Sequence, residues 1–383
     1  MRILEITSTP VFYPGGMEKV IWEISKRLAK KHDVTILQTT LYDDEKKYAY
    51  NGVKEGVKII TIDTSSFLFG YGYSKKFKNK LNEIWSNFDI VHVHGCGRFT
   101  TDFSLWYLGD KLPIVFTSHG FFHTKTKNVL KIFDKILLKK LFKRVSAFTA
   151  LTQNEFGQYE GYGISKNKIF EVPNGIELKK FRENAVKVKK LKEKYSLGKN
   201  VILYVGRIHK SKGLEYLVRA VKNIDCQVFL VGKDFEYMDE LKKLAESLGI
   251  GEKIIFTGPV SEGELVASYF ASDLFALPSE HEGFGIVVIE AMATGLPVVV
   301  SDRGSLPYIV ENGKNGFVVP FGNVRELGRK LELILKNEKM RKEISKENKL
   351  KAMKYDWGDI VNKYENIYKK VLRSSRDEKL DFA

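Results

Sequence analysis

Short apolar runs alternate with longer amphipathic segments along the whole chain. In the first half, Val20, Ile21, Ile24 and Leu28 recur at the spacing of one helical face and predict a helix. Runs rich in β-branched and aromatic residues predict six strands, at 2–7, 33–38, 57–62, 90–94, 114–118 and 147–151. Strands that alternate with helices in this way are typical of βαβ units around a parallel sheet.

The same alternation begins again after about residue 200. It predicts six further strands, at 201–205, 227–231, 253–257, 273–277, 297–301 and 316–319. Between the two series, Pro173, Asn174 and Gly175 form a turn signal, and a lysine-rich polar stretch follows. We therefore expect an α/β fold of two Rossmann-like domains, 1–176 and 177–362, with ligands bound beyond the carboxyl ends of the strands.

The end of the chain adds one more predicted helix. Residues 357–372 have an amphipathic pattern, and residues 374–383 form a polar tail that we expect to fray. The segment at about 363–383 is expected to pack back on the first domain.

Composition narrows the class of protein. The chain has 383 residues, of which 43% are hydrophobic and 29% charged, which excludes disorder and disulfide scaffolds. Cys96 and Cys226 lack metal-ligand spacing and are interpreted as reduced thiols of a cytoplasmic protein. The N-terminal apolar run is too short for a signal peptide, and no stretch reaches the roughly 18 apolar residues of a membrane span.

The formal net charge of +16 suggests an anionic partner. Residues 125–144 contain eight basic residues and one acid, and a helix there would carry lysines at every fourth position opposite an apolar stripe. Such a helix either lies on anionic lipid or packs its apolar stripe on a sheet, and periodicity does not separate the two. No basic patch interleaved with aromatic residues is present, so nucleic acid is not an expected partner.

One candidate site follows the predicted strand 273–277. Residues 278–285 contain Gly283 and Gly285 and lead into a helical pattern, an arrangement that lets backbone N–H groups approach a phosphate. Glu282 and Glu290 flank this turn, and a carboxylate accepts hydrogen bonds from a sugar diol. The alternative is that the glycines only turn the chain and Glu290 caps a neighbour or faces solvent.

A second candidate follows the predicted strand 201–205. Gly206 turns the chain, and Arg207 and Lys212 then place two cations where a leaving diphosphate would gain negative charge. Lys210 and Lys212 could instead be ordinary solvated charges in a lysine-rich protein.

The first half carries weaker signals at its strand ends. Gly15 and Gly16 follow the first strand but do not complete the Gly-x-Gly-x-x-Gly pattern, which argues against a nicotinamide dinucleotide. His92 and His94 end one strand, and His119 ends the next. These histidines are either structural or part of the wall of a sugar-binding cleft.

In their order along the chain, these motifs resemble family 4 retaining glycosyltransferases. The matching residues are Gly15-Gly16, His92-x-His94, His119-Gly120, Pro173-Asn174-Gly175, Gly206-Arg207, Lys212-Gly213 and the two glutamates, Glu282 and Glu290, separated by seven residues. The resemblance covers nearly the whole chain and implies the GT-B fold, in which two Rossmann-like domains face each other across a cleft and the nucleotide sugar is held mainly by the C-terminal domain.

The resemblance also assigns roles to individual residues. It implies that Arg207 and Lys212 hold the diphosphate, with backbone from Gly16, and that Glu290 binds the ribose. It further implies that Glu282 binds the donor sugar together with the amides around Phe284, Gly285 and Ile286. His119 would approach the same sugar near its reacting carbon.

The expected function is retaining transfer of a hexose from a nucleoside-diphosphate sugar, with a UDP-sugar favoured and a GDP-sugar next. The acceptor would be a hydroxyl of a glycan or lipid-linked molecule, with no metal or other cofactor. The protein would be cytoplasmic, with the cytoplasmic face of the membrane as a further location. The alternatives are a GT-B sugar-nucleotide epimerase or phosphorylase and, with least support, a basic membrane-binding or nucleic-acid-binding protein.

Overall fold

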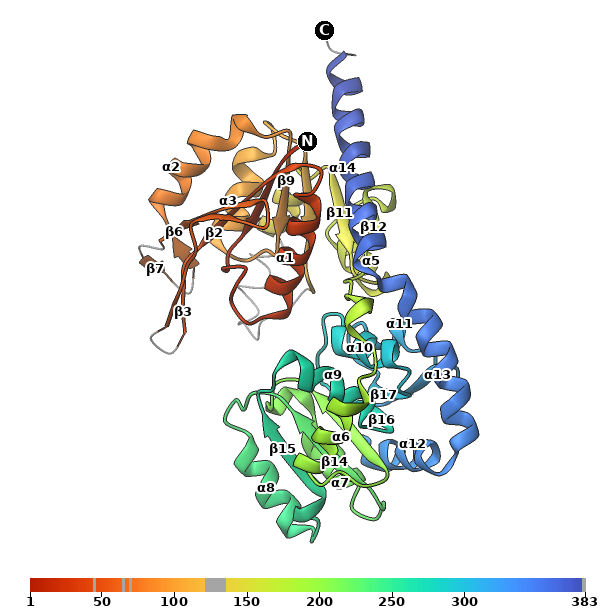
Figure 1. The fold of residues 1–383 in the computed structure, drawn as a ribbon. Coiled ribbons are helices and arrows are strands. Elements are labelled where there is room, and N and C mark those ends of the chain that lie inside the picture. The colour runs from red at the N-terminus through yellow and green to blue at the C-terminus, as the bar shows by residue number, and fades with distance from the viewer. Residues whose placement is uncertain (44–45, 64–65, 69–70, 121–135, 381–383) are drawn as a thin grey trace. The chain divides into compact units, whose positions relative to one another are not determined.

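The computed structural model describes residues 1–43, 46–63, 66–68, 71–120 and 136–380 (Figure 1). The chain forms two compact units. The N-terminal unit contains Met1–Asn174 and the C-terminal segment from Trp357 onward, and the C-terminal unit contains Gly175–Asp356.

A mainly parallel sheet forms the centre of the N-terminal unit. Its strand order is β12-β11-β10-β9-β1-β2-β6-β5, and β5 pairs antiparallel to β6. The strands are β1 (Arg2–Thr7), β2 (Asp33–Thr39), β5 (Gly52–Lys54), β6 (Val57–Ile62), β9 (Ile90–His94), β10 (Ile114–Thr117), β11 (Ala147–Ala150) and β12 (Ile169–Glu171). All six predicted strands are confirmed within a residue or two of their expected ends. The sequence analysis missed β5 and β12, which are short edge strands, and the hairpins β3 (Leu41–Asp43) with β4 (Lys46–Tyr48) and β7 (Ser66–Leu68) with β8 (Tyr71–Tyr73).

Helices of the N-terminal unit include one that comes from the far end of the chain. They are α1 (Gly16–Leu28), α2 (Lys75–Ile84), α3 (Phe99–Leu108), α5 (Gln153–Gly161) and α14 (Trp357–Leu380). Helix α14 contacts α1 (Figure 1). Its Lys370 lies over the ring of Phe170 in β12. The predicted end of this helix at residue 372 was wrong, because α14 continues to Leu380, and residues 381–383 of the expected tail lie outside the described residues. No helix in the described part of the chain combines the length and the apolar composition of a membrane span.

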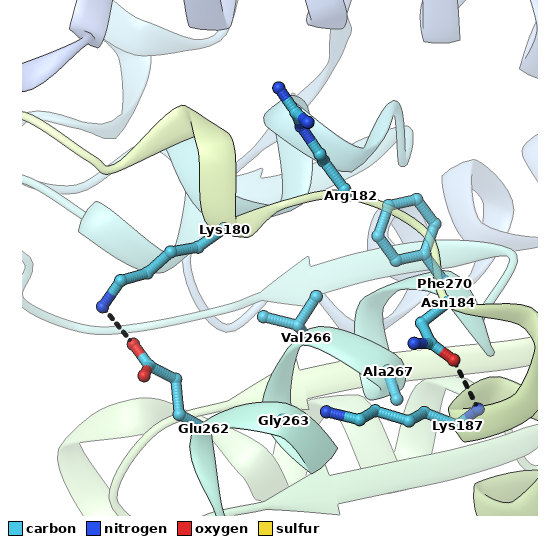
Figure 2. A pocket seen from close by; sticks show the side chains of 9 residues that line it. All are labelled: Lys180, Arg182, Asn184, Lys187, Glu262, Gly263, Val266, Ala267 and Phe270. Carbon is cyan, nitrogen blue, oxygen red and sulfur yellow. Dashed lines mark hydrogen bonds and ion pairs between the residues drawn. The ribbon is translucent and has the colours of Figure 1, made fainter.

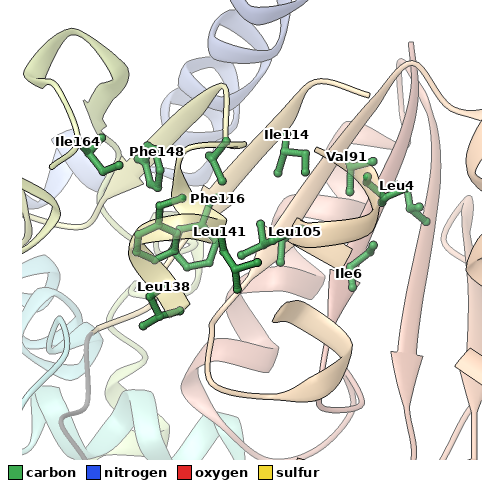
Figure 3. Close-up of a cluster of buried hydrophobic side chains, with 14 of the residues drawn as sticks. Leu4, Ile6, Val91, Leu105, Ile114, Phe116, Leu138, Leu141, Phe148 and Ile164 are labelled. Atoms are coloured by element: carbon green, nitrogen blue, oxygen red, sulfur yellow. The ribbon is translucent and has the colours of Figure 1, made fainter. Parts of the chain in front are cut away.

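The two faces of this sheet differ in chemistry because side chains alternate along each strand. One face is apolar: Leu4, Val91 and Phe116 pack there with Leu105 of α3 (Figure 3). The opposite face carries Glu5, His92, His94, Thr117 and Thr149, all buried. A row of buried polar groups of this kind requires hydrogen-bond partners, and it is a candidate for part of a functional site.

The described part of the basic segment packs on the apolar face. Residues 136–142 are helical, and Leu138, Leu141, Phe142 and Val145 are buried in the same cluster. Lys139, Lys140 and Lys143 are exposed, and so is Ile136. The rest of this segment, up to residue 135, lies outside the described residues, so the alternative of a lipid contact stays untested.

The C-terminal unit has a six-stranded parallel sheet in the order β15-β14-β13-β16-β17-β18. The strands are β13 (Val201–Val205), β14 (Gln227–Val231), β15 (Ile254–Gly258), β16 (Leu274–Leu277), β17 (Val298–Ser301) and β18 (Gly316–Val319), each close to its predicted range. The surrounding helices are α6 (Ala185–Lys194), α7 (Leu214–Ala220), α8 (Met238–Ser247), α9 (Glu262–Phe270), α10 (Ile286–Thr294), α11 (Leu306–Ile309), α12 (Val324–Lys336) and α13 (Glu338–Ala352). This order is that of a Rossmann sheet, and its switch point lies between β13 and β16. Ligands of such sheets bind beyond the carboxyl ends of the strands at the switch point.

Candidate active site

The loop after β13 carries the two predicted cations. Arg207 is exposed, and its guanidinium carbon lies 5.5 Å from the centre of the Phe235 ring. Lys212 ends a short 3₁₀ turn, Lys210–Lys212, and its side chain is 13% exposed. The alternative of a purely solvated charge therefore suits Lys210, which is exposed, better than Lys212.

This loop touches the loop after β16 through Gly213. Gly213 has a φ of +64°, and a Cβ atom there would lie 2.2 Å from the carbonyl oxygen of Pro278. The N–H of Glu280 also donates to the carbonyl of Ser211 at 2.9 Å. A side chain at position 213 would push the two loops apart, so glycine is required by both space and conformation.

The same two loops are joined by an ion pair between predicted site residues. Lys212 Nζ lies 2.8 Å from Glu282 Oε2, and the Glu282 side chain is 19% exposed. A partly buried pair is screened by salt less than a surface pair. The cation expected at the diphosphate and the carboxylate expected at the sugar therefore meet across the switch point.

A third loop, after β17, holds the backbone of Glu282 and Gly283 through hydrogen bonds. The N–H of Ser305 donates to the carbonyl of Glu282 at 3.2 Å, and its hydroxyl donates to the carbonyl of Gly283 at 2.6 Å. Gly304 has a φ of +60°, and a Cβ there would lie 2.0 Å from the Glu282 carbonyl. Sequence reasoning missed both residues, although a glycine and a serine just beyond a predicted strand were an available signal.

Helix α10 begins directly after this ion pair. Gly285 caps it with a φ of +90°, and no side chain of a described residue bonds to the first-turn N–H groups as a cap. Phe284 is buried and packs edge-on against Tyr355, with ring centres 6.0 Å apart. The start of α10, with Ile286 as its first residue, can therefore offer N–H groups and the positive end of its dipole to an anion.

Glu290 lies one turn further along α10 and is buried, which rules out the solvent-facing alternative. Its Oε2 accepts a hydrogen bond of 2.8 Å from the hydroxyl of Tyr269. Burial raises the pKa of Tyr269, and the nearby Glu290 charge adds to the effect, so this hydroxyl keeps its proton and remains a donor. Tyr269 is a third residue that sequence reasoning missed.

A separate pocket of about 320 Å³ lies between α6 and α9 (Figure 2). Val266, Ala267 and Phe270 form its apolar part, and Lys180 pairs with Glu262 at its edge at 2.5 Å. None of the predicted site residues lines it. It is therefore distinct from the switch-point loops.

In the N-terminal unit, His119 follows β10 in a conformation unusual for a residue with a side chain. Its φ is +55°, and Gly120 follows with a φ of +98°. The hydroxyl of Ser118 donates to Glu155 at 2.9 Å and accepts from the N–H of Gly120 at 3.2 Å. The turn that carries His119 is thus fastened to α5. Gly16 is the exposed first residue of α1.

The polar face of the sheet forms a network beneath His119. His94 Nδ1 lies 2.9 Å from His119 Nε2, and His94 Nε2 lies 2.5 Å from Glu5 Oε2. His92 bonds to the hydroxyls of Tyr368 in α14 at 2.6 Å and Thr117 at 2.7 Å. The C-terminal helix is therefore part of the network.

Glu5, His92 and His94 are close enough together to hold a metal ion. Two imidazoles and a carboxylate would suit zinc or iron. However, the side chains of all three are fully buried, and each already makes hydrogen bonds within the network. A cation would have to break these bonds, so hydrogen bonding accounts for the cluster without an ion.

Burial sets the protonation of the histidines. It lowers the pKa of His94, and the neighbouring His92 adds to this, while Glu5 acts in the opposite direction. Burial likewise lowers the pKa of His119 well below its ordinary value. Burial opposes ionisation of Glu5, but the adjacent imidazoles of His92 and His94, whose N–H dipoles and hydrogen bonds favour the carboxylate, outweigh it and lower the pKa of Glu5. At neutral pH, Glu5 is therefore ionised and His94 and His119 are neutral.

Comparison with known families covers most of both units. Residues 14–180 match the family described as Glycosyltransferase Family 4, and residues 187–351 match Glycosyl transferases group 1. The chain belongs to this glycosyltransferase family. The match confirms the resemblance drawn from the motifs and identifies the protein as an enzyme that transfers sugars.

The glycosyltransferase is similar to several named relatives. It is 32% identical over 217 residues to an uncharacterized glycosyltransferase of Methanocaldococcus jannaschii, a match that spans 54% of this chain and 55% of that relative. It is 28% identical to the phosphatidyl-myo-inositol mannosyltransferase of Mycobacterium leprae over 75% of each chain. Among solved structures, the Anabaena protein HepE in complex with UDP superposes with a TM-score of 0.80 at 19% identity, over 97% of this chain and all of that one. The expected GT-B fold is confirmed.

The predicted site residues of the glycosyltransferase fall in both units. Gly16 and His119 lie in the N-terminal unit, and the others lie in the C-terminal unit. Within the latter, the structure brings Lys212 and Glu282 into contact and places Gly285 beside Glu282. The roles assigned to these residues toward a donor remain predictions.

Proposed function

We propose that this glycosyltransferase moves a hexose from a nucleoside-diphosphate sugar to a hydroxyl group with retention of anomeric configuration and without a bound metal. The observation that carries the proposal is the contact of Lys212 with Glu282 at 2.8 Å, at the switch point of a Rossmann-order sheet. In this contact Lys212, the cation that would bind the diphosphate, lies beside Glu282, the carboxylate that would bind a sugar hydroxyl. The uncapped start of α10 adds N–H groups for the same anion.

In the proposed reaction, Arg207 and Lys212 stabilise the charge that grows on the diphosphate as the glycosidic bond breaks. Lys212 has three donors, so it can keep Glu282 and still bind a phosphate oxygen. The acceptor hydroxyl attacks the same face of the sugar that the diphosphate leaves, through an oxocarbenium-like state. The departing phosphate oxygen takes the proton of that hydroxyl, so no second carboxylate is needed as a nucleophile.

A UDP-sugar is the favoured donor and a GDP-sugar the next. A solved structure of similar fold, HepE, is named as a complex with UDP-glucose, which supports a uridine donor. The proposed acceptor is a glycan or lipid-linked hydroxyl. A relative named as a phosphatidyl-myo-inositol mannosyltransferase supports the lipid-linked class.

A ligand panel tests this proposal. UDP, GDP, UDP-glucose and GDP-mannose are added to the protein with excess chelator, and melting is followed, because a ligand that binds only the folded state raises the melting temperature. We expect stabilisation by one nucleotide and its sugar. A shift that disappears with chelator would contradict metal independence, and no shift with any of them would contradict the donor class.

Turnover then separates the alternatives. A transferase releases nucleoside diphosphate only when an acceptor, or water at a lower rate, is present. A phosphorylase would instead require inorganic phosphate, and an epimerase would change the sugar without any acceptor.

A further inference from the structure

We propose that Glu5 and His94 are positioning residues that hold His119 in the tautomer protonated on Nε2, so that Nδ1 accepts a hydrogen bond from a hydroxyl group of the donor sugar. The identity of that ligand rests on the proposed function. The tautomer itself does not, because it follows from contacts inside the N-terminal unit.

The first step concerns the bond between Glu5 and His94. An ionised carboxylate can only accept hydrogen bonds, so His94 Nε2, 2.5 Å from Glu5 Oε2, carries a proton and donates it. A neutral imidazole has one N–H group, and His94 is neutral because burial lowers its pKa. His94 Nδ1 is therefore an acceptor.

The second step passes this polarity to His119. Its Nε2 lies 2.9 Å from the accepting Nδ1 of His94, so it must carry the proton of the shared hydrogen bond. His119 is also neutral, since burial lowers its pKa. Its Nδ1 therefore bears a lone pair and no proton.

The third step concerns what this Nδ1 can bind. His119 is only 7% exposed, and its Nδ1 has no hydrogen-bond partner among the described residues. A buried polar atom without a partner is costly, which favours a ligand group that donates to it. A phosphate or carbonyl oxygen has no proton to give, whereas a sugar hydroxyl does.

The backbone holds the ring in this position. His119 has a φ of +55°, a left-handed conformation that is strained when the residue has a side chain. On either side of it, the hydroxyl of Ser118 accepts from the N–H of Gly120 and donates to Glu155, which is buried and also accepts from the N–H of Leu151 at 2.6 Å. Strain kept in place by such anchors is characteristic of positions with a function.

His92 provides a matched comparison on the same strand. It is equally buried and also lies near Glu5, at 3.2 Å. Both of its nitrogens already have hydroxyl partners, Tyr368 and Thr117, and it makes no recorded hydrogen bond to His119. A purely structural role would make His92 and His94 equivalent, and a positioning role would not.

The tautomer is tested by ¹⁵N NMR of the imidazole nitrogens in the full-length protein at neutral pH. His119 signals are assigned by their loss in His119→Gln. We expect a protonated Nε2 and an unprotonated Nδ1 in the wild type and in His92→Gln, and a mixture of tautomers in Glu5→Gln and His94→Leu. His94→Gln should restore the wild-type pattern, because its amide can donate to Glu5 and accept from His119.

Two results would overturn the positioning role. One is a wild-type His119 protonated on Nδ1 or on both nitrogens. The other is an unchanged His119 tautomer in Glu5→Gln, a variant that keeps the size of the buried side chain. The first needs no substitution in the network, so a variant that fails to fold does not prevent a decision.

Calorimetry tests the contact with the sugar. UDP is compared with UDP-glucose, or GDP with GDP-mannose if the wild type prefers that pair. His94→Leu should weaken binding of the nucleotide sugar about tenfold, which corresponds to the loss of one hydrogen bond. The affinity for the nucleoside diphosphate should stay unchanged. Equal effects on both ligands, or no effect, would contradict the sugar contact. If the wild type binds neither pair, the proposed function fails, and the NMR result still decides the tautomer.

Discussion

At the scale of single residues, the C-terminal site depends on pairs rather than on isolated charges. Lys212 and Glu282 hold each other at 2.8 Å, and Glu290 is held by Tyr269 at 2.8 Å. A partner fixes the direction of a charged side chain before a ligand arrives, which lowers the entropy that binding must overcome. Substitution of either partner is therefore expected to disturb the orientation of the other.

The contribution of Lys212 can be measured directly. Lys212→Ala should lower turnover on the order of a hundredfold, because it removes a charge that stabilises the leaving diphosphate. Lys210→Ala is the control, since Lys210 lies exposed on the same turn. Initial rates of nucleoside diphosphate release measure both. A Lys212→Ala enzyme within a few-fold of the wild type would show that the assignment is wrong.

The Tyr269 hydroxyl should contribute to stability. Tyr269→Phe leaves a buried carboxylate of Glu290 without this donor, so we expect a loss of about 1–3 kcal/mol in the free energy of unfolding. Tyr308→Phe is the matched control, because the Tyr308 side chain is 50% exposed. Urea unfolding compares the two, and equal effects would contradict the expectation.

At the scale of elements, the site is formed by loops that approach one another too closely for side chains. Gly213 and Gly304 each lie against the backbone of another loop and have positive φ values of +64° and +60°. Gly213 follows β13, which borders the switch point, and Gly304 follows β17, the neighbour of β16 on the far side of the switch point. Packing between loops, rather than any one loop alone, gives Glu282 its place.

The close approach at Gly213 can be separated from its conformation. Gly213→Ala meets both a positive φ and the Pro278 carbonyl, whereas Gly249→Ala meets a similar φ of +71° with no heavy atom within 4 Å. Gly249→Ala should cost about 1 kcal/mol from conformation alone. Gly213→Ala should cost distinctly more and should also lower activity. Melting temperatures and turnover test this, and equal losses would contradict a role for the contact.

At the scale of the whole molecule, the chain leaves the N-terminal unit and returns to it. Helix α14 brings Tyr368 against His92, so residues 276 positions apart share one hydrogen bond. The net charge of +16 is not concentrated at one site: among the described residues many lysines and arginines are exposed on helices, and several form ion pairs within one helix, such as Lys342 with Glu338. Such exposed pairs stabilise the fold little.

The buried histidines should make stability depend on pH. Burial lowers the pKa of His32, His94 and His119 in the folded protein relative to about 6.5 in the unfolded chain. Below that value the unfolded chain binds more protons, so stability falls as pH falls, by up to about 1.4 kcal/mol per pH unit for each group. Most carboxylates contribute mainly below pH 4.5, and Glu155, whose pKa burial raises, acts in the opposite direction, so a loss of stability between pH 6.5 and 5 is due to the histidines.

Melting curves across this window measure the effect. The melting temperature should fall from pH 6.5 to pH 5, and His119→Gln should reduce the slope. His281→Gln, at an exposed position, should leave the slope unchanged. A slope that is the same in all three proteins would show that the buried histidines do not control it.

The parallel α/β architecture, twelve strands of the two main sheets and the family could be predicted from the sequence. Hydrophobic periodicity is a local property and predicts the strands and helices. The order along the chain of glycines, histidines and charged residues at strand ends is also visible without any knowledge of contacts, and it identifies the family. The sequence did not indicate β5 and β12, the two edge strands of the N-terminal sheet, because runs of three residues carry too little periodicity.

The contacts between side chains of the site depend on the folded arrangement of the chain. The pairing of Lys212 with Glu282, the support of Glu282 by Ser305, and the chain of bonds from Glu5 through His94 to His119 join residues far apart in sequence. Burial, which sets the protonation of these histidines, is also a property of the packed sheet and of α14. The types of residue at the site are local information, whereas their partners, tautomers and pKa values arise from distances that only folding creates.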